Sequence, residues 1–304
     1  MNEAANKSPE RSHGWGDPLP GTVTGGMVRS RMTGSTKLTP PQVYEQVLVP
    51  AVLRSLAERV VDLAAPTEGE RVLDLACGTG IVARSVAPIV GTEGTVVGVD
   101  VLPPMLAVAR SLPAPDGAAI DWREGDATAL DLPDASFDLV VCQQGLQFFP
   151  DRAATAAEVH RVLAPDGRFV AAVWQSIDRQ PFWKPFSQIE ARNLAPLGLG
   201  IEDVRIPFSW GEAEPIRELL EASGFSSIEL STTTIQTDFA AETFVEDLEY
   251  PYGALVHGFV EDPEAFATFV AAVRERSRDL RDQYRRDDRI TFEMPANLVV
   301  ARRP

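Results

Sequence analysis

The segment from Arg71 to Gly80 reads RVLDLACGTG and constrains the fold more than any other part of this chain. Its apolar start predicts a buried β-strand. Its glycines predict a turn into a helix, because glycine lets the backbone approach a ligand closely. One carboxylate, Asp74, precedes the turn, and a second, Asp100, ends the next apolar run, TVVGVD. This arrangement is typical of a parallel sheet that binds an adenosine-containing molecule, with the second acid accepting hydrogen bonds from the ribose.

Two kinds of adenosine ligand fit this turn. Residues 78–83 also satisfy the G-x-G-x-x-G/A pattern, so a NAD-dependent oxidoreductase remains an alternative. Asp74, however, lies on the strand, where a dinucleotide fold usually keeps apolar residues, and its carboxylate can bind an ammonium group. Asp126 follows the third expected strand, where it can accept from an adenine amino group. An amino acid at one end and adenosine at the other describe S-adenosyl-L-methionine (SAM).

Several motifs in order resemble the class I SAM-dependent methyltransferases, specifically the small-molecule group that includes the ubiquinone and menaquinone biosynthesis enzymes. The motifs are residues 72–80, Asp100 with Met105, residues 125–127, residues 131–141 and residues 166–169. The resemblance covers residues 71–174 closely and the remainder loosely. It implies an α/β fold with a Rossmann-like sheet of seven strands, mostly parallel with an antiparallel last strand, and a helical cap.

The composition narrows the substrate class. The chain has 304 residues, with 44 acids against 28 bases and a net charge of −16. Such a surface repels phosphate backbones, so we expect a small-molecule acceptor and no nucleic acid. No apolar run reaches the length of a membrane span and the first residues are polar, so we expect no membrane association, no signal peptide and a cytoplasmic protein. No Cys/His cluster has metal-ligand spacing, so we expect no metal, and the oligomeric state is left open.

Three parts follow one another along the chain. Residues 1–39 are expected to form a flexible tail, 40–174 the N-terminal helices and SAM-binding core, and 175–304 the substrate side, with a helical lid near 239–286. The core should alternate strands at 71–76, 95–100, 119–124, 137–143 and 168–174 with helices at 80–89, 103–111 and 151–163. Alternation of this kind predicts parallel strands joined by right-handed crossovers. Further strands are expected at 226–234 and 289–301.

The resemblance also implies the cofactor residues. Asp74 orients the methionine ammonium and Asp100 holds the ribose diol. The others are Ala76, Gly78 and Gly80 for close backbone approach, Val101 and Met105 beside adenine, Asp126 and Ala127 at the adenine edge, Gln143 below the methionine portion, and Tyr44 from the helix before the sheet. Three of them have structural alternatives: Asp74 as a cap of the turn's own amides, and Met105 and Tyr44 as packing residues.

The acceptor site is expected to leave a weaker signature. In methyl transfer the protein mainly aligns a nucleophile, and it needs a base only when the nucleophile sheds a proton. Gln147 stands where much of the family has a histidine and can position a substrate but not take its proton. His257 is the candidate base, with a structural or solvated histidine as the alternative. The candidate substrate contacts are Trp174, Trp183, Phe186, Tyr250 and Tyr252. Such side chains suit a planar or lipid-like acceptor and could also hold a cation by its charge, and core packing is their structural alternative.

The predicted function is therefore a SAM-dependent methyltransferase with a small-molecule acceptor, oxygen ahead of nitrogen and carbon, and S-adenosyl-L-homocysteine as product. One alternative keeps the SAM-binding fold but catalyses a rearrangement or cyclisation without methyl transfer. The other is the NAD-dependent oxidoreductase.

Overall fold

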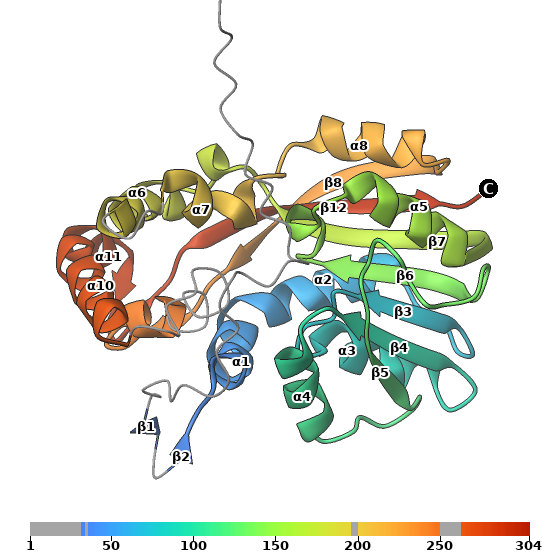
Figure 1. The fold of residues 1–304 in the computed structure, drawn as a ribbon, viewed down its shortest axis with the longest axis horizontal. Helices are drawn as coiled ribbons and strands as arrows, with labels where there is room; N and C mark the ends of the chain where they lie inside the picture. Colours follow the sequence, from blue (N-terminus) through green and yellow to red (C-terminus); the bar gives the residue numbers. More distant parts are fainter. Residues whose placement is uncertain (1–31, 34–35, 196–199, 250–262) are drawn as a thin grey trace, which may run out of the picture.

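A seven-stranded sheet with helices on both faces forms the centre of the protein (Figure 1). The computed structural model describes residues 32–33, 36–195, 200–249 and 263–304. The strands lie in the order β5-β4-β3-β6-β7-β12-β8. Their bounds are β3 Arg71–Leu75, β4 Thr95–Asp100, β5 Ile120–Glu124, β6 Phe137–Gln143, β7 Leu163–Trp174, β8 Ser226–Gln236 and β12 Glu293–Arg302.

The pairing directions confirm the predicted mostly parallel sheet. Strands β3 to β7 pair in parallel, whereas β12 pairs antiparallel with both β7 and β8. The antiparallel register places Val300 opposite Val170 and Glu229. Because the parallel strands share one direction, their carboxyl ends meet at one edge, which is where α/β sheets bind ligands.

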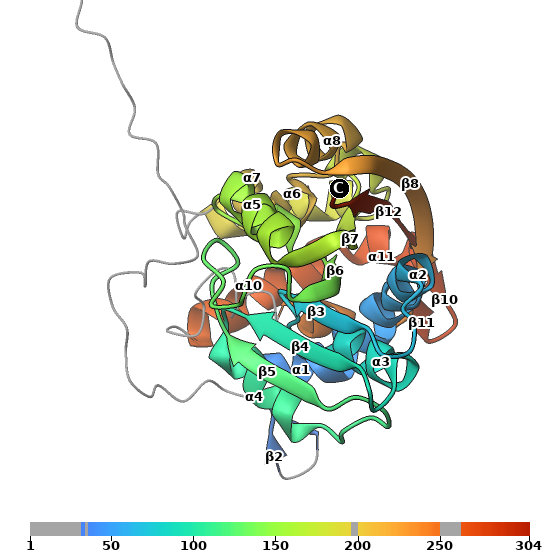
Figure 2. The same cartoon turned by 90° about the vertical axis from the view of Figure 1, so that its right-hand side faces the viewer.

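Side chains alternate between the two faces of the sheet, and each face has its own helices (Figure 2). Val72 belongs to one buried cluster with α2 and α3, whereas Leu73 belongs to the other with α5 and α8. The helices are α2 Arg54–Ala64, α3 Ile81–Val90, α4 Pro103–Ser111, α5 Arg152–Val162 and α8 Ala213–Ala222. Strands buried on both faces are near-continuously apolar, as the sequence of β3, β4 and β6 shows.

The helical segment before the sheet is one continuous but irregular helix. Helix α1 (Pro40–Val43) continues into a π-helical stretch, η1 (Tyr44–Leu53), and then into α2. Pro50 lies inside η1 and has no N–H to donate, which interrupts the regular ladder. This helix brings Tyr44 to the strand edge.

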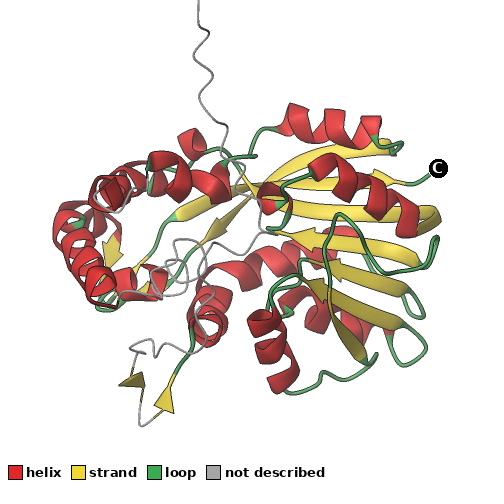
Figure 3. Cartoon of the chain, in the orientation of Figure 1, coloured by secondary structure: helices red, strands yellow, loops and turns green. Residues whose placement is uncertain are grey.

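A helical group lies beyond the carboxyl edge of the sheet (Figures 1 and 3). Its elements are η3 Ile177–Arg179, α6 Trp183–Leu194, α7 Ile201–Arg205, η5 Ile206–Phe208, α10 Pro263–Arg276 and α11 Arg278–Tyr284, with the small sheet β9 Phe239–Ala240, β10 Arg285–Arg286 and β11 Arg289–Ile290. A short hairpin, β1 Met32–Thr33 and β2 Thr36–Lys37, precedes α1. The lid near 239–286 stays a prediction, and residues 250–262 of it lie outside the described part.

Aromatic rings pack this helical group against the sheet. Phe182 is fully buried and stacks on Phe292 with ring centroids 4.1 Å apart. It also contacts Phe186 and Phe244, so rings from several segments share one core. Within the described residues, no helix is long and apolar enough to span a bilayer, and no group of three or more His, Cys, Asp or Glu side chains is placed to hold a metal ion.

Candidate functional site

The turn between β3 and α3 adopts left-handed backbone conformations that favour glycine. Gly78 and Gly80 have φ values of 55° and 85°, and Ala76 has a φ of 56°. A left-handed alanine costs roughly 1–2 kcal/mol, so Ala76 stores backbone strain in the turn that the two glycines do not. Gly80 starts α3 and packs under Trp122, whose ring would lie 2.1 Å from an added Cβ.

Asp100 anchors this turn to the end of β4. Its Oδ2 accepts a hydrogen bond from the Gly78 N–H at 2.7 Å, and its Oδ1 accepts from the Leu102 N–H at 2.9 Å. The carboxyl is 8% exposed, and burial raises its pKa above the ordinary value. Each carboxylate oxygen keeps a second lone pair, so Asp100 can still accept from a ligand hydroxyl.

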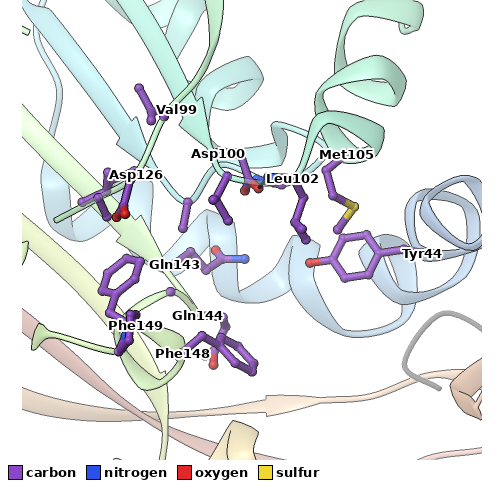
Figure 4. Close-up of a pocket in the computed structure, with 18 of the residues that line it drawn as sticks. Tyr44, Val99, Asp100, Leu102, Met105, Asp126, Gln143, Gln144, Phe148 and Phe149 are labelled. Atoms are coloured by element: carbon purple, nitrogen blue, oxygen red, sulfur yellow. Dashed lines mark hydrogen bonds between the residues drawn. The ribbon is translucent and has the colours of Figure 1, made fainter. Parts of the chain in front are cut away.

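Most of the expected cofactor residues lie around one cavity of about 220 Å³, here called the strand-edge cavity (Figure 4). The expected residues that line it are Tyr44, Ala76, Gly78, Asp100, Val101, Met105, Asp126, Ala127 and Gln143. They come from the segment before the sheet, the β3–α3 turn, the ends of β4, β5 and β6, and, for Met105, the first turn of α4. The meeting of parallel strand ends at one edge explains why residues so far apart in sequence converge.

Polar groups of this cavity have capacity left for a ligand. The Gln143 amide donates to the Leu53 carbonyl at 3.3 Å, but its buried Oε1 has no hydrogen-bond partner. The Tyr44 hydroxyl points into the same space (Figure 4). Burial, and next the carboxylate of Asp100, raise the pKa of Tyr44, which therefore stays a neutral donor. Asp126 accepts from the N–H and hydroxyl of Thr128 through one oxygen, Oδ1.

Asp74 and Gly80 do not line the strand-edge cavity. Asp74 is buried beneath the turn, and its Oδ2 accepts from the Ala83 N–H at 2.9 Å. Burial raises its pKa to about 7. The structure thus places Asp74 as a link between β3 and the first turn of α3, which is the structural alternative, and its contact with an ammonium group stays a prediction.

A second cavity, of about 180 Å³, adjoins the first and is here called the aromatic cavity. Of the residues expected in the acceptor site, Trp174, Trp183 and Gln147 line it. The two cavities share Tyr44, Leu48, Gln144 and Phe148. Leu48, Gln144 and Phe148 were not singled out from the sequence, because their position between two ligand spaces depends on how η1 packs against the loop after β6.

The other acceptor candidates lie elsewhere. Phe186 is fully buried and does not line the aromatic cavity. It stacks on Phe182 at 5.2 Å, so it belongs to the core beneath the cavity. Tyr250, Tyr252 and His257 fall outside the described residues.

A pair of buried carboxyls beside the aromatic cavity was not predicted from the sequence. Glu190 of α6 lines the cavity and is 4% exposed, and Glu249, at the end of the helical residues 244–249, is 1% exposed. Burial raises both pKa values, that of Glu190 to about 7, and the charge of Glu190 raises that of Glu249 further. A signal existed: Phe186, Glu190 and Leu194 recur at i, i+4 and i+8, which places Glu190 on the buried face of α6.

Residues 72–167 match the model of a methyltransferase domain. A demethylmenaquinone methyltransferase of Deinococcus radiodurans is 45% identical over 166 residues, which are 51% of this chain and 67% of that protein. The chain belongs to the SAM-dependent methyltransferase family. The cofactor of this family is SAM.

Other comparisons give the reach of this family likeness. The nocamycin O-methyltransferase of Saccharothrix syringae is 40% identical over 38% of this methyltransferase chain and 41% of its own length. This chain spans about half the length of several curated relatives, between 41% and 56%. A putative methyltransferase of Bacillus halodurans C-125 shares the fold with a TM-score of 0.52 at 19% identity, over 82% of this chain and 99% of that one.

The residues of this chain fit SAM at the strand-edge cavity. Asp100 offers carboxylate lone pairs to the ribose hydroxyls, and the orphaned Gln143 Oε1 is a further acceptor in the lining. A Cβ on Gly78 would lie 3.9 Å from Met105 Cε and 4.0 Å from the Tyr44 hydroxyl, so glycine keeps space open between them.

We expect Gly78→Ala to weaken SAM binding by about 10-fold or more, because the added methyl would occupy cavity space that the cofactor needs, and steric conflict of this kind costs about 1–3 kcal/mol. Calorimetric titration with SAM measures the loss. The matched control is Gly69→Ala, which has a left-handed φ of 83° but no atom within 4 Å of the added Cβ. Both variants carry backbone strain, so equal affinities for SAM in the two would contradict a role for Gly78 in the cavity.

We expect Glu249→Gln to stabilise the folded protein more at pH 8 than at pH 5. Burial raises the folded-state pKa of both carboxyls above the unfolded value, so the unfolded chain releases protons first and wild-type stability falls as pH rises through this interval. Glutamine does not titrate, and the gain at pH 8 should be at least about 1 kcal/mol. Urea unfolding at both pH values measures it.

Few charged groups surround the buried carboxyls of Glu190 and Glu249. Among the described residues, neither Glu190 nor Glu249 forms an ion pair, and each is the other's only charged neighbour with an effect on its pKa. Glu202→Gln removes an exposed carboxylate from α7 and serves as control. If Glu202→Gln and Glu249→Gln respond alike to pH, the buried pair does not titrate as expected.

Proposed function

We propose that this chain transfers a methyl group from SAM to a small-molecule acceptor, with oxygen preferred over nitrogen and carbon. The observation that carries the proposal is the contact between the two cavities, which share Tyr44, Leu48, Gln144 and Phe148. A cofactor in the strand-edge cavity and an acceptor in the aromatic cavity would meet at this boundary, as an in-line displacement requires.

Bound SAM would supply an electrophilic methyl group on a sulfonium. The chain's own contribution is alignment and exclusion of water, and positioning of this kind lowers a barrier by roughly 7–11 kcal/mol. Asp100 would hold the ribose and Tyr44 would close the cofactor from the helical side. Gln144 lies at the boundary with an unpartnered Nε2 donor, which can orient an oxygen of the acceptor.

Apolar walls favour a planar acceptor with a large apolar surface. Trp174, Trp183 and Phe208 line the aromatic cavity, and aromatic side chains bind flat rings by stacking and edge contacts. Two relatives, matched over 50% and 41% of their own lengths, are named a demethylmenaquinone methyltransferase and a nocamycin O-methyltransferase, which supports a quinone-like or hydroxylated acceptor. Gln147 would position such a molecule without accepting its proton, and His257 is the proposed base that would take the proton as the O–C bond forms.

The test has two parts. Separate calorimetric titrations with SAM and NAD should show binding of SAM alone; tight NAD binding without SAM binding would restore the oxidoreductase alternative. Methyl-labelled SAM is then incubated with a panel of quinols and phenols, and products are analysed by mass spectrometry. Label on oxygen supports the proposal, label on nitrogen or carbon corrects the accepting atom, and SAM binding with no label transferred favours a rearrangement or cyclisation.

A further inference from the structure

The aromatic cavity is lined by a buried amide oxygen without a donor and by a buried carboxyl. Gln147 is 3% exposed; its Nε2 donates to Gln144 Oε1 at 2.7 Å, while its Oε1 has no partner. Glu190 brings the carboxyl, which shares a side-chain hydrogen bond with the buried Glu249. Buried polar groups are normally satisfied, so the orphaned Gln147 Oε1 beside the Glu190 carboxyl favours a ligand that supplies a donor.

The carboxyls of Glu190 and Glu249 also lack a neighbouring cation among the described residues. Among the described residues, no lysine or arginine forms an ion pair with Glu190 or Glu249, and only burial and the other carboxyl alter their pKa values. A buried carboxylate without a cation is costly, so the pair stays protonated to a higher pH than an exposed carboxyl, and a bound positive charge would favour its ionised form. Trp174 and Trp183 also line the cavity, and aromatic rings attract cations over their faces.

We propose that the acceptor molecule carries a basic amine, and that Glu190, with Glu249 behind it, binds this amine as an ammonium ion in the aromatic cavity. An ammonium group fits better than a hydroxyl, because it brings a positive charge and up to three donors for Glu190 and Gln147. The inference rests on the proposed function at one point, the assignment of the aromatic cavity to the acceptor.

The consequence for the reaction is that the bound amine is not the methylated atom. An ammonium nitrogen has no free electron pair, so a nucleophile elsewhere on the molecule must face the strand-edge cavity. The orphaned Nε2 donor of Gln144, which lines both cavities, suits an oxygen at that reacting end. Glu190 is thus a specificity-determining residue, and oxygen remains the preferred accepting atom.

The experiment compares two probes of one shape, 4-phenylbutylamine and 4-phenylbutanol, without SAM. Binding is followed by calorimetry and by tryptophan fluorescence, to which Trp174 and Trp183 contribute. Wild type should bind the amine at least 10-fold more tightly than the alcohol at pH 7.5. The amine affinity should rise between pH 5.5 and 8, and below pH 7 binding should release a proton to the buffer, because Glu190 then gives up its proton to pair with the ammonium ion.

Variants separate a binding role from a structural one. Glu190→Gln should reduce the amine-to-alcohol ratio to about one while leaving the alcohol affinity and SAM affinity unchanged, which also shows that the variant is folded. Glu249→Gln should retain the preference, since Glu190 keeps its carboxylate. Glu202→Gln, on the surface of α7, is the charge-matched control and should leave the ratio unchanged.

Three results would overturn the proposal: equal binding of the two probes to wild type, an unchanged ratio in Glu190→Gln, or no binding of either probe. Because SAM is absent, these results are independent of methyl transfer. A chain that binds the amine as expected but transfers no label would retain the ammonium site and lose the proposed function. A chain that transfers label but binds both probes equally would retain the proposed function and lose the ammonium site.

Discussion

Replacing Asp100 by asparagine is expected to weaken SAM binding by about 10- to 150-fold. The carboxylate accepts from the backbone of Gly78 and Leu102 and lines the strand-edge cavity. Asparagine keeps one oxygen and turns an NH₂ group toward a backbone N–H, so one acceptor is lost and two donors face each other. Loss of a hydrogen bond to a charged group costs about 1.5–3 kcal/mol, which gives this range. Calorimetric titration with SAM measures it.

The control for this variant is Asp121→Asn on β5. Asp121 pairs with Arg123, and both side chains are largely exposed, so the same change of charge occurs away from the cavity. Exposed ion pairs contribute little, and SAM affinity should stay within about twofold of wild type. If Asp100→Asn binds SAM as well as Asp121→Asn does, the ribose is not held at Asp100.

Replacing Phe182 by alanine is expected to lower the free energy of unfolding by about 3–5 kcal/mol. Phe182 is fully buried between the rings of Phe186 and Phe292 and meets Phe244 and Tyr284 edge-on. Truncation would leave a cavity that rings from four segments border, and stacked rings cannot all move inward at once. Equilibrium unfolding in urea, followed by circular dichroism, gives the value.

Ile89→Ala is the matched truncation on the surface. Ile89 lies on α3 and is 43% exposed, so its removal should change stability by no more than about 0.5 kcal/mol. A small effect of Phe182→Ala would mean that the helical group beyond the strand edge is loosely attached. A large loss of stability in a single cooperative transition would show that this group and the sheet unfold together.

Local patterns predicted the first half of the sheet closely. The strands expected at 95–100 and 137–143 match β4 and β6, and the strand expected at 71–76 ends one residue later than β3. Each of these strands is a short apolar run bounded by turn residues, and such runs are identified without knowledge of their neighbours. The last strand was less well placed: the expected range 289–301 divides into β11 and β12, which lie in different sheets.

The residues of the acceptor site were predicted less completely than those of the cofactor site, for a physical reason. Trp174 ends a strand of the core, and the structure places it at the aromatic cavity. Phe186 has the same aromatic character, yet it points into the core, because aromatic type alone does not distinguish a cavity wall from packing. Glu190 was not predicted, because it is one of 44 acidic residues and an acid by itself does not indicate a binding site.

The order of residues along the chain therefore determined the fold class and the cofactor edge. These depend on apolar runs, on glycines with left-handed φ angles and on acids at strand ends, all of which act within one βα unit. Only the tertiary structure decided that Asp74 binds the Ala83 amide, that Gln144 borders two cavities and that Glu190 faces one of them without a cation. These features arise where η1, α6 and the loop after β6 meet, and contacts between distant segments are set by packing of the whole molecule rather than by local propensity.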